Sequence, residues 1–355
     1  MSPVEKSAAS HNDQRGANLY RVAIVGAASL QGKEIAEVLR DRNFPAVDIR
    51  LLDDDESLGQ LEAVGDEVSF IQSVRAEQFE RVDFTFFASD VRSTRDAWKK
   101  ARDMGSTIVD LSGALEDEPG ASVRSPWIER QSEQPVTPQL QPGPVVAAHP
   151  AATVLALLAL RAQKAAQVER MIATVLEPAS EYGQKGMDEL HEQTVNLLSF
   201  QELPKTVFDV QVAFNMVARY GPRSGHSLAS LSQMITKHYR QLVPGAVEPA
   251  LLTLLAPVFH GLAFSVYLEL EKPLPSKDLS EALAGEHVIV TDPDDVPNNV
   301  SAAGQGDILV AVSADASHKS GFWLWAVTDN LRVAALSAVE CAETMTASRP
   351  RGQIQ

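Results

Sequence analysis

The chain has 355 residues, 45% of them hydrophobic, which is enough for two domains that each bury a core of their own. Its formal net charge of −16 at pH 7 excludes duplex nucleic acid as a natural partner, because phosphate contacts need clustered Lys and Arg. The single cysteine, Cys341, excludes an internal disulfide and any site that needs several cysteines, and its apolar surroundings predict a small core residue on a helix.

The first part of the chain alternates predicted strands and helices. Residues 1–18 are polar and predict a mobile tail. From Tyr20, an apolar run, a turn of small residues and an amphipathic helix form a β-turn-α unit. The alternation continues through "VDIRLLDDD", "RVDFTFFAS", "RDAWKKARDMG" and "STIVDLSG". This order predicts a doubly wound parallel sheet with right-handed crossovers over residues 19–150.

The pattern changes after Pro150. Longer strands are predicted in "VERMIATVLEPAS" and "LAFSVYLELEK", and then in "VIVTDP", "DILVAVSAD" and "FWLWAVTDN", with little helix between the last three. They predict a second domain over residues 151–327 with a mainly antiparallel sheet. A long amphipathic helix over 328–347 is expected to pack back on the first domain, and residues 348–355 form a second polar tail.

The sequence gives no sign of a membrane or a metal. No run of 18 apolar residues occurs, and the N-terminal segment lacks the hydrophobic core of a signal peptide, so we expect a cytoplasmic protein without a membrane partner. The eight histidines show no ligand spacing such as His-x-x-x-His. No metal site is therefore predicted.

Five segments in this order carry a family likeness: "VAIVGAASLQGKEIAEVLRDRNFP", "STIVDLSGAL", "VQVAFNMV", "APVFHG" and "WLWAVTDNLRVAALSAVECAE". Together they resemble the aspartate-semialdehyde dehydrogenase family, from about Tyr20 to Glu343. The resemblance implies a Rossmann-like domain that binds NADP and an α+β domain for substrate and dimerisation. It also implies reductive dephosphorylation of an acyl phosphate through a cysteine thioester.

The residues that would perform this reaction are replaced. The family's Asn-Pro-Asn-Cys-Ser-Thr turn falls on residues 149–154, which places its nucleophile at Ala152. An alanine methyl has no lone pair, so no thioester can form. The family's acid/base histidine falls on Leu262 and its orienting glutamine on Glu177. We expect no catalytic residue of the family reaction, and His260 is the candidate substitute because it lies two positions before Leu262 on the same side of a strand.

Other positions of the family's site are changed as well. The arginine for the substrate carboxylate falls on Leu255, and the arginine of the phosphate site falls approximately on Glu116. Both anion-binding forks would thus be lost. Thr153, beside the position of the missing nucleophile, is expected to cap the helix that follows.

The cofactor turn is only partly kept. "GAASLQG" retains Gly26 and Gly32, whereas Ser29 replaces the glycine that lets backbone approach a pyrophosphate, although its hydroxyl could cap the helix instead. The acids 53–56 would repel the 2′-phosphate of NADP, whereas Asp53 could bind the ribose of NAD; a solvated acidic loop without ligand is the alternative. Asn330 matches the family's asparagine beside the nicotinamide, or caps the last helix. No cofactor is certain, and NAD is favoured over NADP.

Three functions are compatible with this pattern, the third of which is the family activity itself, retained by a rearranged site. The first is a pseudoenzyme, similar to the silent Usg-type paralogues of the family, that acts by binding or by pairing with other subunits. The second is an active NAD(P)-dependent oxidoreductase of amino-acid metabolism with altered chemistry, using a group such as His260 or Tyr182. A homodimer is implied by the resemblance, and a heterodimer with an active paralogue stays open.

Overall fold

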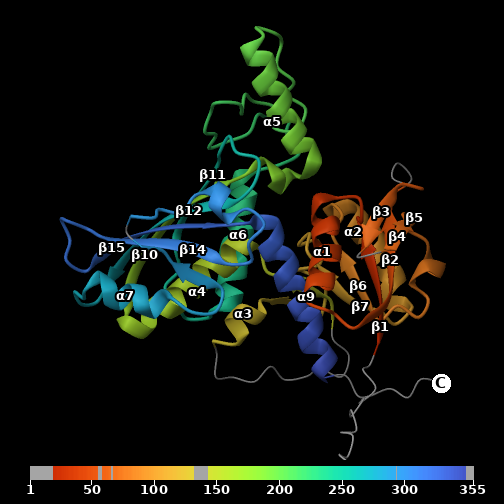
Figure 1. Cartoon of the computed structure of the whole chain (residues 1–355), viewed down its shortest axis with the longest axis horizontal. Coiled ribbons are helices and arrows are strands. Elements are labelled where there is room, and N and C mark those ends of the chain that lie inside the picture. Colours follow the sequence, from red (N-terminus) through yellow and green to blue (C-terminus); the bar gives the residue numbers. More distant parts are fainter. Residues whose placement is uncertain (1–18, 55–57, 65–66, 132–142, 293, 349–355) are drawn as a thin grey trace, which may run out of the picture.

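The computed structural model describes residues 19–54, 58–64, 67–131, 143–292 and 294–348. The predicted N-terminal tail, and the predicted C-terminal tail after Ser348, lie outside these residues. Two β-sheets form separate lobes, and the C-terminal helix α9 (Asn330–Ser348) runs between them (Figure 1).

The first lobe is built on a seven-stranded parallel sheet, which confirms the predicted doubly wound fold. Its strand order is β5 (Gln72–Ser73), β2 (Ala46–Asp53), β1 (Tyr20–Val25), β6 (Phe84–Phe87), β7 (Thr107–Asp110), β9 (Val145–Ala147) and β8 (Ser122–Arg124). Helix α1 (Leu30–Asp41) packs with α9 in one core, and α2 (Val91–Asp103) packs in another. The lobe also holds the hairpin β3 (Leu61–Val64) and β4 (Glu67–Phe70) and the 3-10 turn η2 (Ala76–Phe79). The short helix α3 (Pro126–Glu129) instead packs Trp127 and Ile128 into the core of the second lobe.

The second lobe has a six-stranded mixed sheet. Its order is β11 (Ala250–Leu255), β10 (Val168–Glu177), β12 (Leu262–Leu270), β15 (Gly321–Thr328), β14 (Ile308–Ala314) and β13 (Val288–Val290). The three central pairs are antiparallel, as expected, but both edge strands pair in parallel. The largest core forms where α4 (Pro150–Ala165), α6 (Leu228–Leu242) and α7 (Ser276–Leu283) pack on this sheet. The remaining helical elements are η3 (Ala179–Tyr182), α5 (Gly183–Leu198), which projects from the lobe in Figure 1, and α8 (Asn299–Ala302).

The other face of this sheet stays partly open. Alternation along β10 turns Val175 and Glu177 toward the core, whereas Ile172 is 45% exposed on the opposite face. The strand register places Ile172, Tyr267 and Trp323 in one row across β10, β12 and β15. Trp323 is 47% exposed, and its ring packs 4.9 Å from that of Tyr267. These three residues define an open apolar face.

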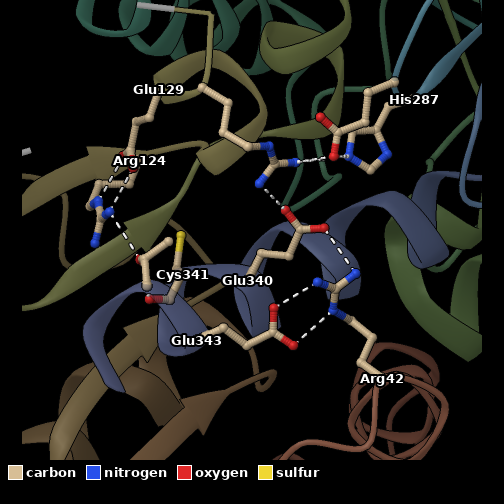
Figure 2. A network of polar contacts seen from close by, with 10 residues as sticks. Arg42, Arg124, Glu129, His287, Glu340, Cys341 and Glu343 are labelled. Carbon is tan, nitrogen blue, oxygen red and sulfur yellow. Dashed lines mark hydrogen bonds and ion pairs between the residues drawn. The ribbon is translucent and has the colours of Figure 1, made fainter. Parts of the chain in front are cut away.

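Ion pairs connect helix α9 to α1 and to Arg130 at the end of α3. Asp329 caps its N-terminus by accepting from the N–H groups of Leu331 and Arg332, and the Arg332 guanidinium contacts Glu34 and Asp41 of α1. Further along, Glu340 contacts Arg42 at 3.1 Å (Figure 2). It also contacts Arg130 at 2.8 Å.

Cys341, beside Glu340 on α9, is fully buried in the core that α9 shares with α1. Burial raises the pKa of its thiol to about 12. The prediction of a core cysteine is therefore confirmed, and the thiol is unreactive at neutral pH.

Candidate functional site

A cavity of about 60 Å³ lies where the two lobes meet at the start of α4. Strands β7 and β9 end beside it, as expected for a ligand site at the carboxyl edge of a parallel sheet. Both lobes and α9 contribute its lining residues: Gln31, Leu111, Ser112, Gly113, Ala147, Ala148, His149, Pro150, Glu181, Met234, His238, Asn330 and Ala334.

Two histidine–carboxylate pairs border the cavity and contact each other. Nε2 of His149 lies 3.1 Å from Glu181 Oε1, and Nε2 of His238 lies 3.1 Å from Glu116 Oε2. The backbone N–H of His149 donates to His238 Nδ1 at 3.0 Å. Because Nδ1 accepts, the proton of neutral His238 lies on Nε2 and is donated to Glu116. Burial lowers the pKa of His238 to about 4, so this ring is neutral at pH 7.

His149 also caps α4, which corrects the prediction for Thr153. The His149 Nδ1 atom accepts from the N–H of Ala151 at 3.1 Å, and the helix begins at Pro150. Thr153 lies inside the first turn, and its buried hydroxyl has no partner among the described residues. The prediction failed because a histidine is an uncommon cap, whereas threonine is a preferred one.

Glu181 is held as a carboxylate. Besides the contact with His149, its Oε2 accepts from Asn330 Nδ2 at 3.1 Å. Burial opposes ionisation, but the contacts with His149 and Asn330 lower the pKa of Glu181 below its ordinary value. The Asn330 amide oxygen in turn accepts from Ser180 Oγ and the Gly261 N–H, so this side chain is fixed on both sides.

Glu177 lies close to Glu181, but its carboxylate has no hydrogen-bond partner among the described residues. It ends β10, faces the core and is fully buried. Neither of its carboxylate oxygens has a hydrogen-bond partner within the part of the chain that the structure describes. Burial and the neighbouring charge of Glu181 raise the pKa of Glu177 well above its ordinary value.

The positions that the resemblance assigns to the family's chemistry lie in packed cores. Ala152 and Leu262 are fully buried in the large core of the second lobe, and Leu255 is buried in a neighbouring one. None of the three lines the cavity. The cavity is lined instead by His149, Glu181 and His238, which the sequence did not predict as a group, because the contacts join segments 32 and 89 residues apart.

His260, the candidate substitute, lies half-buried in the turn between β11 and β12. Its carbonyl accepts from Asn299 Nδ2, and the residue is not among those that line the cavity. Glu116 is not among the residues that line the cavity, but it contacts His238, which does line it, as well as Lys237.

The predicted cofactor turn connects β1 to α1. Gly26 has φ +83°, and a Cβ there would lie 2.6 Å from the backbone nitrogen of Ser89. A Cβ on Gly32 would lie 2.2 Å from the Gly26 carbonyl oxygen. Both glycines are therefore required by the backbone itself, whether or not a ligand binds.

Side chains occupy two N–H groups of this turn. The Ser29 hydroxyl accepts from the Gly32 N–H at 2.9 Å and so caps α1. Asp53 accepts from the Ala28 N–H at 2.7 Å, and burial raises the pKa of its carboxyl group. A pyrophosphate on a helix N-terminus uses N–H groups of this kind, so here it would have to displace side chains. Residues 55 and 56 of the acidic run lie outside the described residues.

The two lobes define a protein with a Rossmann-like lobe and an α+β lobe, and two family models match the chain. The semialdehyde dehydrogenase NAD binding domain matches residues 21–168, and the semialdehyde dehydrogenase dimerisation domain matches residues 157–333. The chain belongs to the semialdehyde dehydrogenase family, and within it to the aspartate-semialdehyde dehydrogenase group of USG-1 type.

Individual relatives cover nearly the whole chain. The USG-1 protein homolog of Azotobacter vinelandii is 30% identical over 91% of this chain and 97% of its own length. The aspartate-semialdehyde dehydrogenase of Rickettsia conorii is 25% identical over 92% of this chain and 97% of its own. A solved structure of a probable aspartate-semialdehyde dehydrogenase from Pseudomonas aeruginosa superposes with a TM-score of 0.82 at 28% identity, over 92% of this chain and 98% of that one.

Among the described helices, none combines the length and the apolar composition that crossing a bilayer requires.

Proposed function

We propose that this protein is a member of the aspartate-semialdehyde dehydrogenase family that has lost the acyl-transfer reaction and acts by binding. The observation that carries the proposal is the burial of Ala152 and Leu262 in one apolar core. A nucleophile and a proton-transfer group must both reach the substrate. Here the positions assigned to them by resemblance carry aliphatic side chains that contribute to packing instead.

The charge of the cavity supports the same conclusion. The described residues that line it include Glu181 and two histidines but no Lys or Arg. Recognition of an acyl phosphate and a substrate carboxylate needs cationic forks of the kind that arginine provides. This cavity instead favours a small neutral or cationic ligand.

A coupled assay with aspartate semialdehyde, phosphate and NADP tests the proposal. We expect no turnover above the background without protein. Turnover that is lost in the His260→Ala or Glu181→Gln variant would refute the proposal, because it would show a working site built from other residues. The Glu192→Gln variant, changed at an exposed residue of α5, is the matched control.

The second candidate, an NAD(P)-dependent oxidoreductase with altered chemistry, is favoured by the match to the NAD binding domain model. It requires dinucleotide binding. Because Ser29 and Asp53 already occupy N–H groups of the turn, we expect calorimetry to detect no binding of NADP or NAD tighter than about 1 mM. Micromolar binding of either would favour the oxidoreductase.

Ser29→Gly is expected to make dinucleotide binding measurable. The change frees the Gly32 N–H and removes the side chain beside the turn, and a glycine cap costs only about a few tenths of a kcal/mol relative to serine. Calorimetry with NAD and NADP would compare this variant with the wild type. If the two proteins bind alike, Ser29 is not what limits the affinity.

We further propose a homodimer formed through the open apolar face of Ile172, Tyr267 and Trp323, supported by the match to the dimerisation domain model. Trp323→Glu should convert the dimer to a monomer in analytical ultracentrifugation, because it places a charge in the buried centre of the interface. Met104→Glu changes a 44% exposed apolar residue of the first lobe and should leave the dimer intact. A wild-type monomer that dimerises only with an active paralogue would favour the heterodimer.

A cytoplasmic location stays a prediction.

A further inference from the structure

The Glu177 carboxylate is a buried polar group for which the described residues provide no hydrogen-bond donor. Its side chain is fully buried, and both oxygens lack a hydrogen-bond partner among the described residues. Buried polar groups are almost always paired, and an exception points to a water, an ion or a functional role. An ionised carboxylate in such surroundings costs several kcal/mol unless a positive charge compensates it.

Two further ligand groups lie beside this carboxylate. Ligand atoms of Glu177, Glu181 and His149 all lie within 4.8 Å of one another. They come from three elements: the end of β10, the turn η3 and the residue before α4.

Within the described residues, the basic group beside these two acids is the His149 ring, and it contacts Glu181 rather than Glu177. Leu255 lies beside Glu177 in the register of β10 and β11, and the described contacts of Glu181 come from the His149 ring and the Asn330 amide. Two ionised carboxylates and one neutral imidazole together carry two negative charges, which a divalent ion would neutralise.

We propose that Glu177, Glu181 and His149 form a binding site for a divalent transition-metal ion. Carboxylate oxygen and imidazole nitrogen together suit Zn²⁺ and its neighbours, whereas Mg²⁺ keeps several waters and fits poorly in a buried position. Asn330 donates to Glu181 and holds this ligand in place, as the partners of metal ligands generally do. The site departs from the sequence-based expectation of no metal, and it does not depend on whether the protein has lost the family reaction.

The two glutamates are the principal ligands, and His149 is the weaker third. The His149 Nδ1 atom accepts the Ala151 N–H, which places the ring proton on Nε2 in the metal-free protein. Coordination through Nε2 therefore releases the α4 cap. The bonds from Zn²⁺ to oxygen and nitrogen are about 2.0–2.2 Å long, so two ligand atoms on one ion lie at most about 4.4 Å apart. Because the ligand atoms here lie within 4.8 Å of one another, the carboxylates need to move inward by less than about 1 Å.

Titration of the full-length protein with Zn²⁺ alone tests the site, by calorimetry and by metal content after dialysis. We expect about one Zn²⁺ per chain and a rise in the melting temperature on loading. Glu177→Gln should weaken Zn²⁺ binding at least about 100-fold, because loss of a partner of a ligand already costs 10–100-fold. His149→Gln should weaken it less, and Glu192→Gln should not change it. Mg²⁺ should not compete.

Two results would overturn the proposal. One is that the wild type takes up no Zn²⁺, and the other is that Glu177→Gln keeps the wild-type affinity. In either case Glu177 would be a neutral acid that holds a proton rather than a metal ligand. Because glutamine has the shape of glutamate, circular dichroism should confirm a folded variant, and Glu181→Gln provides a second test if it does not. None of these measurements uses the assay for semialdehyde turnover, so their failure and that of the proposed function are separate results.

Discussion

Glu340→Ala is expected to lower the free energy of unfolding by about 3 kcal/mol. The Glu340 side chain is only 3% exposed, and it contacts Arg42 (Figure 2) as well as Arg130. Removal of one member of a buried charge network leaves the others uncompensated, which costs about 3–5 kcal/mol. The lower end applies because the two arginine side chains are 33% and 38% exposed, so solvent screens part of the lost interaction.

Urea denaturation followed by circular dichroism measures this change. Glu343→Ala is the matched control, because Glu343 lies one turn further along α9 and also contacts Arg42, yet is 30% exposed. An exposed ion pair contributes less than about 1 kcal/mol. Equal losses in the two variants would show that burial does not determine the contribution of Glu340 to the attachment of α9.

The fold could be predicted largely because its signals are local. Alternating apolar runs and amphipathic helices mark β1, α1, β2 and the strands that follow, and the small residues at 26–29 mark the turn between β1 and α1. The parallel pairing of β11 with β10 gave no such signal. Which strand lies beside β10 depends on contacts between segments far apart in the chain, which a hydrophobic pattern does not encode.

The site was predicted in one respect and missed in another. Comparison with a family motif could identify Ala152, Leu262 and Glu177 as departures, because each needs only its own position in the sequence. The contacts of His149 with Glu181 and His238 could not be found in this way, since they form only when α4, η3 and α6 meet. For the same reason the sequence shows Glu177 as a changed amide, whereas the structure shows it as a buried carboxylate without a partner.

Restoring the family's residues in the variant Ala152→Cys/Leu262→His is expected not to restore semialdehyde dehydrogenase activity. Both positions are fully buried in the core of the second lobe, outside the cavity lining. A thiol in such surroundings has a raised pKa and is not a nucleophile at neutral pH. Among the described residues that line the cavity, there would still be no arginine for the phosphate or the carboxylate. The coupled assay should therefore give the wild-type background.

The same variant should be less stable, and the two substitutions should differ. Leu262→His alone is expected to cost about 3–5 kcal/mol, because it removes leucine packing and buries a polar ring without a partner. Ala152→Cys should cost about 1–3 kcal/mol through overpacking. A maleimide should label the new thiol only after denaturation, with wild-type protein as the control for Cys341. Rapid labelling of folded Ala152→Cys would mean that position 152 is accessible from the cavity. Turnover by the double variant would mean that the surrounding site is still competent and that the replaced side chains alone separate this protein from an active enzyme.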